Sequence, residues 1–176
     1  MENCRKIHKI FLTFFVIGFV VWFGGTLIRT TVALELFDTG RTIELKSKYT
    51  NSERMNTVYI FTVTAPTVII SYIIATVSAV LLTVLWRKEL KQKGWLFMIF
   101  CLFIITIPIQ FKFIYYDYML ANTVYFEKVN DFYHPVIQEY FVEQFKNVAN
   151  NSLRGISLLS ALTCLIYLIW RPLNNN

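Results

Sequence analysis

The polar residues that interrupt otherwise apolar stretches are the side chains of this chain best suited to chemistry. In the segment TIPIQFKFIYYDYML, residues 106–120, a glutamine, a lysine and an aspartate stand among apolar and aromatic neighbours. Polar residues flanking two other apolar stretches are expected at the same membrane depth, which predicts a candidate polar pocket of Arg29, Glu35, Gln110, Lys112, Asp117, Asn151 and Arg154. In such a pocket Asp117 or His134 can act as a base, and Arg154 or Lys112 can stabilise an enolate or a phenolate.

A second interpretation of the same residues is anchoring at the membrane surface. Tyrosines are enriched where a helix leaves the hydrocarbon, and Tyr115, Tyr116, Tyr118 and Tyr125 lie near these polar residues. Under this interpretation Arg29 extends its side chain to the headgroups instead of lining a pocket. Both interpretations are compatible with the sequence.

Motifs for metal, nucleotide or acyl-transfer chemistry do not stand out. The two histidines, His8 and His134, are expected on opposite sides of the membrane, so they cannot share a metal or a haem within one chain. There is no Walker A motif, no G-x-G-x-x-G and no nucleophile elbow. No expected membrane helix has an acidic residue at its centre, which disfavours an ion pump. We therefore predict no metal and no cofactor.

Composition and the apolar runs predict the elements that must position these residues. The chain has 176 residues, of which 56% are hydrophobic and 16% charged. A helix needs about 20 apolar residues to cross a hydrocarbon core of roughly 30 Å. Three runs are about this long, and the fourth reaches it with one turn of flanking residues. We therefore expect an all-α membrane protein, an antiparallel bundle of four transmembrane helices in a single domain, with helices at about 10–37, 57–86, 94–118 and 152–171.

Lysine and arginine placement predicts the orientation of the chain. The loop RKELKQK, residues 87–93, and the N-terminal segment are dense in basic residues, and cytoplasmic loops carry this excess. We expect an integral, multi-pass membrane protein whose N- and C-termini are both cytoplasmic. The net charge of +6 then reflects topology and contact with anionic lipids of the bilayer, and it gives no reason to propose nucleic acid as a partner.

Two further features concern packing. Gly18 and Gly25 are seven residues apart and share a helix face, which can pack against the chain's own helices or against a membrane-protein partner. Residues 135–149 have apolar side chains at helical spacing, with Glu139, Glu143, Gln144 and Lys146 opposite. We expect an extra amphipathic helix here, on the outer side before the fourth transmembrane helix, either as a lid or as an interfacial connection.

Short motifs in this arrangement resemble those of a known family. The first helix carries glycines, the third ends in TIPIQ, residues 106–110, and the fourth opens with NSLR, residues 151–154. This order is similar to that of the small four-helix membrane proteins related to fungal anthrone oxygenase, although Gln110 stands where that pattern has an asparagine. The resemblance implies the same four-helix fold and a cofactor-free oxygenase-like activity.

Two functions follow as expectations. The first is a small membrane protein without a catalytic set, acting as an accessory subunit of a membrane complex or as a binder of a hydrophobic small molecule. The alternative is a cofactor-free oxygenase-like enzyme that acts on a hydrophobic or aromatic substrate at an outward-facing polar pocket.

Overall fold

Four long helices account for most of the chain. The computed structural model describes residues 2–39 and 43–170. Its long helices are α1 (Glu2–Leu34), α2 (Asn51–Leu85), α4 (Gly94–Ala121) and α7 (Val148–Trp170). Each contains a stretch that is long and apolar enough to cross a membrane. The predictions of an all-α chain and of four such helices are confirmed, and they fit an integral multi-pass membrane protein.

The remaining elements are short. A two-stranded antiparallel hairpin pairs β1 (Phe37–Thr39) with β2 (Ile43–Leu45). A short helix, α3 (Arg87–Gln92), connects α2 to α4. After α4 come a π-helical turn, η1 (Asn122–Phe126), the short helix α5 (Pro135–Ile137), a second π-helical turn, η2 (Gln138–Val142), and α6 (Glu143–Lys146).

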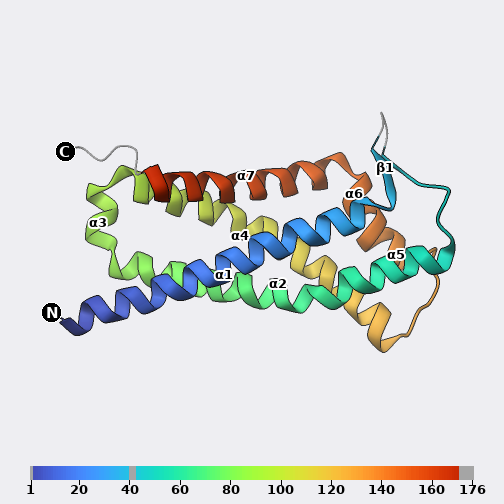
Figure 1. Cartoon of the computed structure of the whole chain (residues 1–176), viewed down its shortest axis with the longest axis horizontal. Helices are drawn as coiled ribbons and strands as arrows, with labels where there is room; N and C mark the ends of the chain where they lie inside the picture. The colour runs from blue at the N-terminus through green and yellow to red at the C-terminus, as the bar shows by residue number, and fades with distance from the viewer. Residues whose placement is uncertain (1, 40–42, 171–176) are drawn as a thin grey trace.

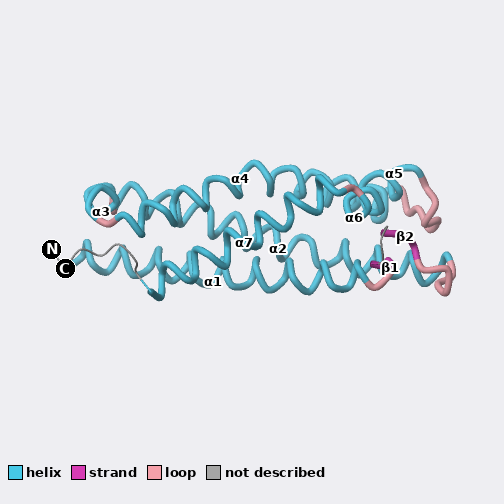
Figure 2. Tube along the Cα trace, turned by 90° about the horizontal axis from the view of Figure 1, so that it is seen from above, coloured by secondary structure: helices cyan, strands magenta, loops and turns pink. Residues whose placement is uncertain are grey.

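The long helices associate in two pairs. In Figures 1 and 2, α1 runs beside α2, and α4 runs beside α7, while contacts between α2 and α4 join the pairs. The start of α1, α3 and the end of α7 lie at one end of the molecule (Figure 1). The hairpin, α5 and α6 lie at the opposite end, which we name the hairpin end.

Several helix boundaries differ from the predicted ones. The helix α1 ends at Leu34, before the predicted residue 37, because the chain turns and Phe37 begins β1, with Leu36 and Phe37 both buried. The helix α2 begins at Asn51 and not at 57, because Thr50 forms a capping box with Glu53. As a result, Glu35 lies beyond the end of α1, and Glu53 lies in the first turn of α2.

The region before the last helix differs more. The single amphipathic helix predicted over 135–149 is replaced by α5, η2 and α6 in succession. The extended backbone of Asn147 then ends α6, so α7 begins at Val148 and not at 152. The helix α4 also differs from its predicted boundary, since it extends past residue 118 to Ala121. The positions of polar side chains around this end therefore depend on local turns that helical spacing does not describe.

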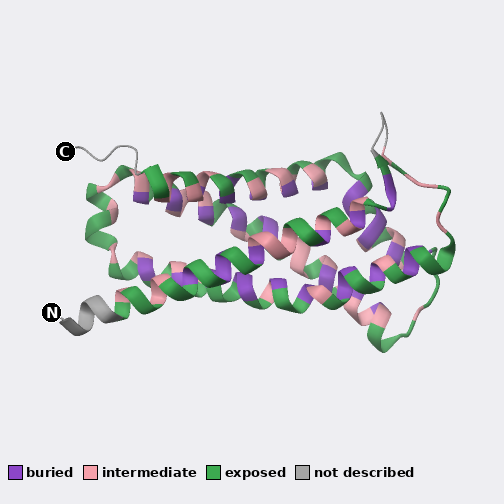
Figure 3. Cartoon of the chain, in the orientation of Figure 1, coloured by how far each residue is buried: buried purple, intermediate pink, exposed green. Residues whose placement is uncertain are grey.

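Burial is uneven along the long helices. Figure 3 shows exposed residues along their outer faces and buried residues where the helices meet. The exposed residues include large apolar side chains such as Ile17, Ile28, Ile70 and Leu159, as expected for surfaces in contact with lipid. One buried cluster, around Phe132, lies at the hairpin end, and another, around Trp22, lies within the long helices.

The glycines of α1 allow its close packing on α2. A Cβ atom at Gly18 would lie 2.7 Å from the Ser71 carbonyl oxygen and 2.9 Å from the Ala75 nitrogen. A Cβ atom at Gly25 would lie 2.7 Å from Cγ2 of Val68. The glycine face thus packs within the chain's own helices, and a membrane-protein partner on this face stays a prediction.

Candidate functional site

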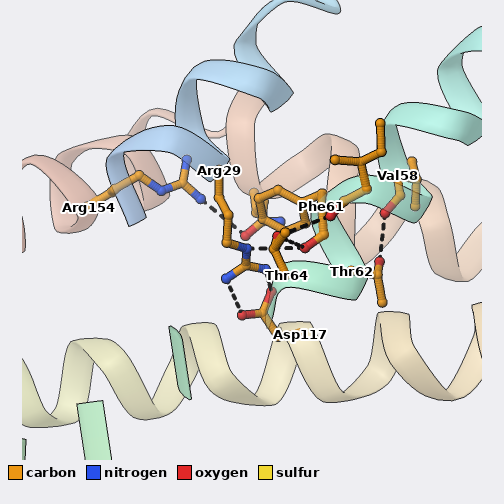
Figure 4. Close-up of polar contacts among 9 residues, drawn as sticks. Arg29, Val58, Phe61, Thr62, Thr64, Asp117 and Arg154 are labelled. Atoms are coloured by element: carbon orange, nitrogen blue, oxygen red, sulfur yellow. Dashed lines mark hydrogen bonds and ion pairs between the residues drawn. The ribbon is translucent and has the colours of Figure 1, made fainter. Parts of the chain in front are cut away.

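A buried ion pair is the first component of the candidate site. Arg29 of α1 directs both terminal nitrogens at Asp117 of α4, with Nη1 2.9 Å from Oδ2 and Nη2 2.7 Å from Oδ1 (Figure 4). Its Nε donates to the carbonyl oxygen of Phe61, and its guanidinium lies 4.0 Å from the centre of the Phe61 ring. Arg29 is 8% exposed, so the surface-anchoring interpretation of this residue is wrong.

A second arginine enters the same site without a carboxylate partner. Arg154 of α7 is 9% exposed, and its Nη2 donates to Oε1 of Gln144 at 3.1 Å. Its guanidinium lies 4.1 Å from the centre of the Phe145 ring. Nη1 is buried without a hydrogen-bond partner, and none of the carboxylates in residues 2–39 and 43–170 forms an ion pair with it.

Gln110 ties three helices together beside the arginines. Its Oε1 accepts a hydrogen bond from Nε1 of Trp22 at 3.4 Å, and its Nε2 donates to Oγ of Ser157 at 2.8 Å. These contacts link α4 to α1 and to α7. Both the oxygen and the nitrogen of the Gln110 amide therefore have a partner, and the residue links three helices beside the cavity.

These side chains surround a small cavity. Arg29, Asp117, Arg154 and Gln110 all line it, together with Gln144 and other residues of α1, α2, α4 and α7. Its volume is about 40 Å³. One water needs roughly 10–15 Å³ of such space, so the cavity holds about three waters or one small polar group. Nε2 of Gln144 and Oγ1 of Thr26, which also lines the cavity, are buried without a partner.

The charges of this cavity do not balance. Two arginines line it, and among the described lining residues Asp117 supplies the carboxylate. Both oxygens of Asp117 are engaged by Arg29. A buried charge is costly unless it is paired, and Arg154 has a neutral amide as its hydrogen-bond partner. The site is therefore suited to accept one negative charge.

Three of the predicted pocket residues lie outside this cavity. Glu35 follows the end of α1 and is exposed at the hairpin, where it accepts hydrogen bonds from Lys46, Lys48 and Tyr49. The pKa of Glu35 is lowered to about 2 because the Tyr49 hydroxyl and then Lys46 stabilise the carboxylate. The prediction placed Glu35 in the pocket because it assumed that α1 continues to residue 37.

Lys112 and Asn151 have structural partners instead. Lys112 donates from Nζ to Oδ1 of Asn150 at 2.6 Å, which links α4 to the first turn of α7. Asn151 donates to the carbonyl oxygen of Phe145 and so holds the end of α6 against α7. Both predictions were wrong in this respect: Lys112 follows Gln110 and Asn151 precedes Arg154 closely in the sequence, but their side chains bond at the α6–α7 junction and do not line the cavity.

The proposed bases are not placed to act in the cavity. Asp117 is held by two charged hydrogen bonds from Arg29. His134 is the residue before α5, at the hairpin end, and does not line the cavity. Among the residues that the structure describes, no group of His, Cys, Asp and Glu side chains has an arrangement that could hold a metal ion. The metal and cofactor predictions stay predictions.

Sequence reasoning missed Gln144, which is the partner of Arg154. Helical spacing placed it on the polar, solvent-facing side of the 135–149 segment, yet it is 2% exposed. The π-helical turn η2 ends two residues before Gln144, and a π turn contains more residues than an α turn, so the side chains that follow rotate about the axis. Nothing in the sequence distinguishes Gln144 from Gln138 of the same segment, so no sequence signal pointed to it.

Comparisons of the chain with protein-family models, with curated proteins and with solved structures found no match.

Proposed function

We propose that this protein binds a hydrophobic small molecule that carries a negative charge, and that it does so within the membrane without transforming the ligand. The observation that carries the proposal is Arg154: a buried guanidinium that lines a cavity, has an unpaired Nη1 and has no carboxylate partner among the described residues. An anion at this point would supply the missing charge and charge-assisted hydrogen bonds.

The binding role is supported over the enzymatic alternative by the state of Asp117. A general base must reach a substrate proton, and both Asp117 oxygens are engaged by Arg29. The cofactor-free oxygenase-like alternative rests on the similarity of TIPIQ and NSLR to the anthrone-oxygenase-related family, and no observation at the cavity adds to it.

The orientation and partner predictions belong to the same proposal. We place α3, with Arg87, Lys88 and Lys91, on the cytoplasmic side together with the start of α1 and the end of α7. The candidate site then lies toward the opposite membrane surface. An accessory-subunit role predicts that other subunits co-purify in mild detergent. Mass spectrometry of the purified protein that finds the chain alone would contradict that role and leave the binding proposal intact.

The binding proposal is tested with a charged and a neutral ligand of the same chain length. Decanoate and decanol are added separately to the purified protein, and the thermal unfolding midpoint is measured by circular dichroism. Decanoate should raise the midpoint of the wild type, since a ligand that binds the folded state stabilises it. Decanol should raise it much less.

Variants at Arg154 complete this test. We expect Arg154→Gln to weaken decanoate binding by at least about tenfold, because it removes a charge-assisted interaction. Arg87→Gln, which removes an exposed arginine of α3, is the matched control and should bind normally. Without ligand, Arg154→Gln should unfold at the same temperature as the wild type or higher, since it removes an unpaired buried charge. Equal decanoate binding by the wild type and Arg154→Gln would refute the proposal.

A further inference from the structure

A groove between α1 and α2 reaches the same site from the lipid-facing side. Its volume is about 230 Å³, and it is lined by Gly25, Ile28 and Val32 of α1 and by Ile60, Thr64 and Thr67 of α2, among others. All of these residues lie in stretches apolar enough to span a membrane. At Gly25 the Val68 side chain of α2 packs directly against α1, with its Cγ2 2.7 Å from where a Cβ atom would lie. The groove is thus a mainly apolar recess at membrane depth.

The groove and the polar cavity share a wall. Arg29, Phe61 and Val68 line both of them. Arg29 presents its guanidinium to Asp117 (Figure 4), which lines the cavity and not the groove. Ile28 and Val32, its neighbours in α1, line the groove and not the cavity. A single layer of side chains therefore separates a lipid-facing groove from a cavity with an uncompensated positive charge.

The donors and the size of the cavity select the charged group of the ligand. Nη1 of Arg154 and Nε2 of Gln144 are both buried, unpaired and on cavity-lining residues, which provides two donors for the two oxygens of a carboxylate. At about 40 Å³ the cavity admits a group the size of about three waters. A carboxylate meets this limit, whereas the glycerophosphate headgroup of a phospholipid exceeds it.

From these observations, and resting on the function proposed above, we propose that the ligand is a single-chain fatty carboxylate taken up sideways from the bilayer. Its acyl chain lies in the groove between α1 and α2, crosses the wall at Phe61 and Val68, and places the carboxylate against Arg154 and Gln144. The ion pair between Arg29 and Asp117 stays in place and holds the wall. An apolar chain in the groove and a negative charge in the cavity together match both halves of the site.

The test compares two bulky substitutions on α2. Thr67→Phe fills the groove, and Val63→Phe adds the same side chain at an exposed position of α2 outside the groove lining. Palmitate binding is measured in lipid nanodiscs of fixed composition, from the rise in unfolding midpoint as its mole fraction in the bilayer increases. We expect Thr67→Phe to weaken palmitate binding by about tenfold or more, and Val63→Phe to leave it unchanged.

The outcomes separate this inference from the binding proposal. If Arg154→Gln weakens palmitate binding and Thr67→Phe does not, the anion site stands and the groove proposal is wrong. If neither variant has an effect, both proposals fail. Dioleoylphosphatidate, offered as a competitor, should not displace palmitate, and efficient displacement would show that the site accepts a two-chain phospholipid and would overturn the single-chain carboxylate.

Photolabelling gives a readout that needs no substitution in the groove. A palmitate analogue with a mid-chain diazirine is bound to the wild-type protein in nanodiscs, irradiated, and the labelled residues are mapped by mass spectrometry. Labels should concentrate on residues 21–32 and 60–68, and excess unlabelled palmitate should remove them. Competable labels confined to other helices would overturn the groove assignment even if Thr67→Phe unfolds.

Discussion

Arg29 and Asp117 lie 88 positions apart in the sequence and meet through two charged hydrogen bonds of 2.9 and 2.7 Å. Since α1 packs chiefly on α2 and α4 chiefly on α7, this contact joins the two helix pairs across the interior. It also fixes the wall between the polar cavity and the lipid-facing groove, because Arg29 lines both. The pair therefore has a structural role and a role in shaping the site.

Breaking this pair from one side should be strongly destabilising. Asp117→Ala leaves the Arg29 guanidinium buried beside a second unpaired arginine, and we expect a loss of about 3–5 kcal/mol in the free energy of unfolding. The double variant Arg29→Met with Asp117→Leu removes both charges and should recover most of this loss. Unfolding in detergent, followed by circular dichroism, measures both. Glu89→Gln, which breaks the exposed pair with Lys93, is the control and should cost less than about 0.5 kcal/mol.

Two glycines of α1 should differ in how far the same substitution changes stability. Gly18→Ala places a Cβ atom 2.7 Å from the backbone oxygen of Ser71, so α1 and α2 must separate, at a cost of about 1–3 kcal/mol. Gly24→Ala meets no atom within 4 Å and should be neutral or slightly stabilising, because alanine favours the helix. Unfolding midpoints of the two variants measure the difference. Equal midpoints would mean that α1 does not pack on α2 through Gly18.

Replacing Gln110 should loosen three helices together. Gln110→Leu leaves Nε1 of Trp22 and Oγ of Ser157 without their partner, and a buried unpaired polar group costs about 1–3 kcal/mol. We expect a lower unfolding midpoint and a change in the fluorescence of Trp22, measured in a variant with the other tryptophans replaced by phenylalanine. Gln92→Leu, at an exposed position of α3, should change neither quantity.

Acid should release the hairpin from the end of α1. Because the pKa of Glu35 is lowered from 4.5 to about 2, its ionised form stabilises the fold. That contribution is complete above about pH 4.5 and is lost as the pH falls through about 2. The carboxyl carbon of Glu35, followed by NMR, should titrate near pH 2 in the wild type. In Tyr49→Phe, which removes the main cause of the shift, it should titrate at a higher pH, and an unchanged midpoint would refute the role of Tyr49.

The amino-acid sequence by itself determined the four long helices and the membrane depth at which the polar residues of the site lie. Hydropathy is a local property, since about 20 apolar residues suffice to cross a hydrocarbon core whatever lies next to them. For the same reason Arg29, Gln110, Asp117 and Arg154 could be chosen as site candidates from their positions near the ends of apolar runs, and all four line the cavity.

Only the tertiary structure decided how these residues are paired. Whether Arg29 faces lipid or Asp117 depends on the rotation of α1 and α4 about their axes, which is set by packing between residues far apart in the sequence. Glu35 lies outside the cavity because α1 ends at Leu34. Gln144 lines the cavity because a π turn rotates the side chains that follow it. The same packing leaves Arg154 buried without a carboxylate, and a charge is unpaired or paired only in relation to its neighbours in space.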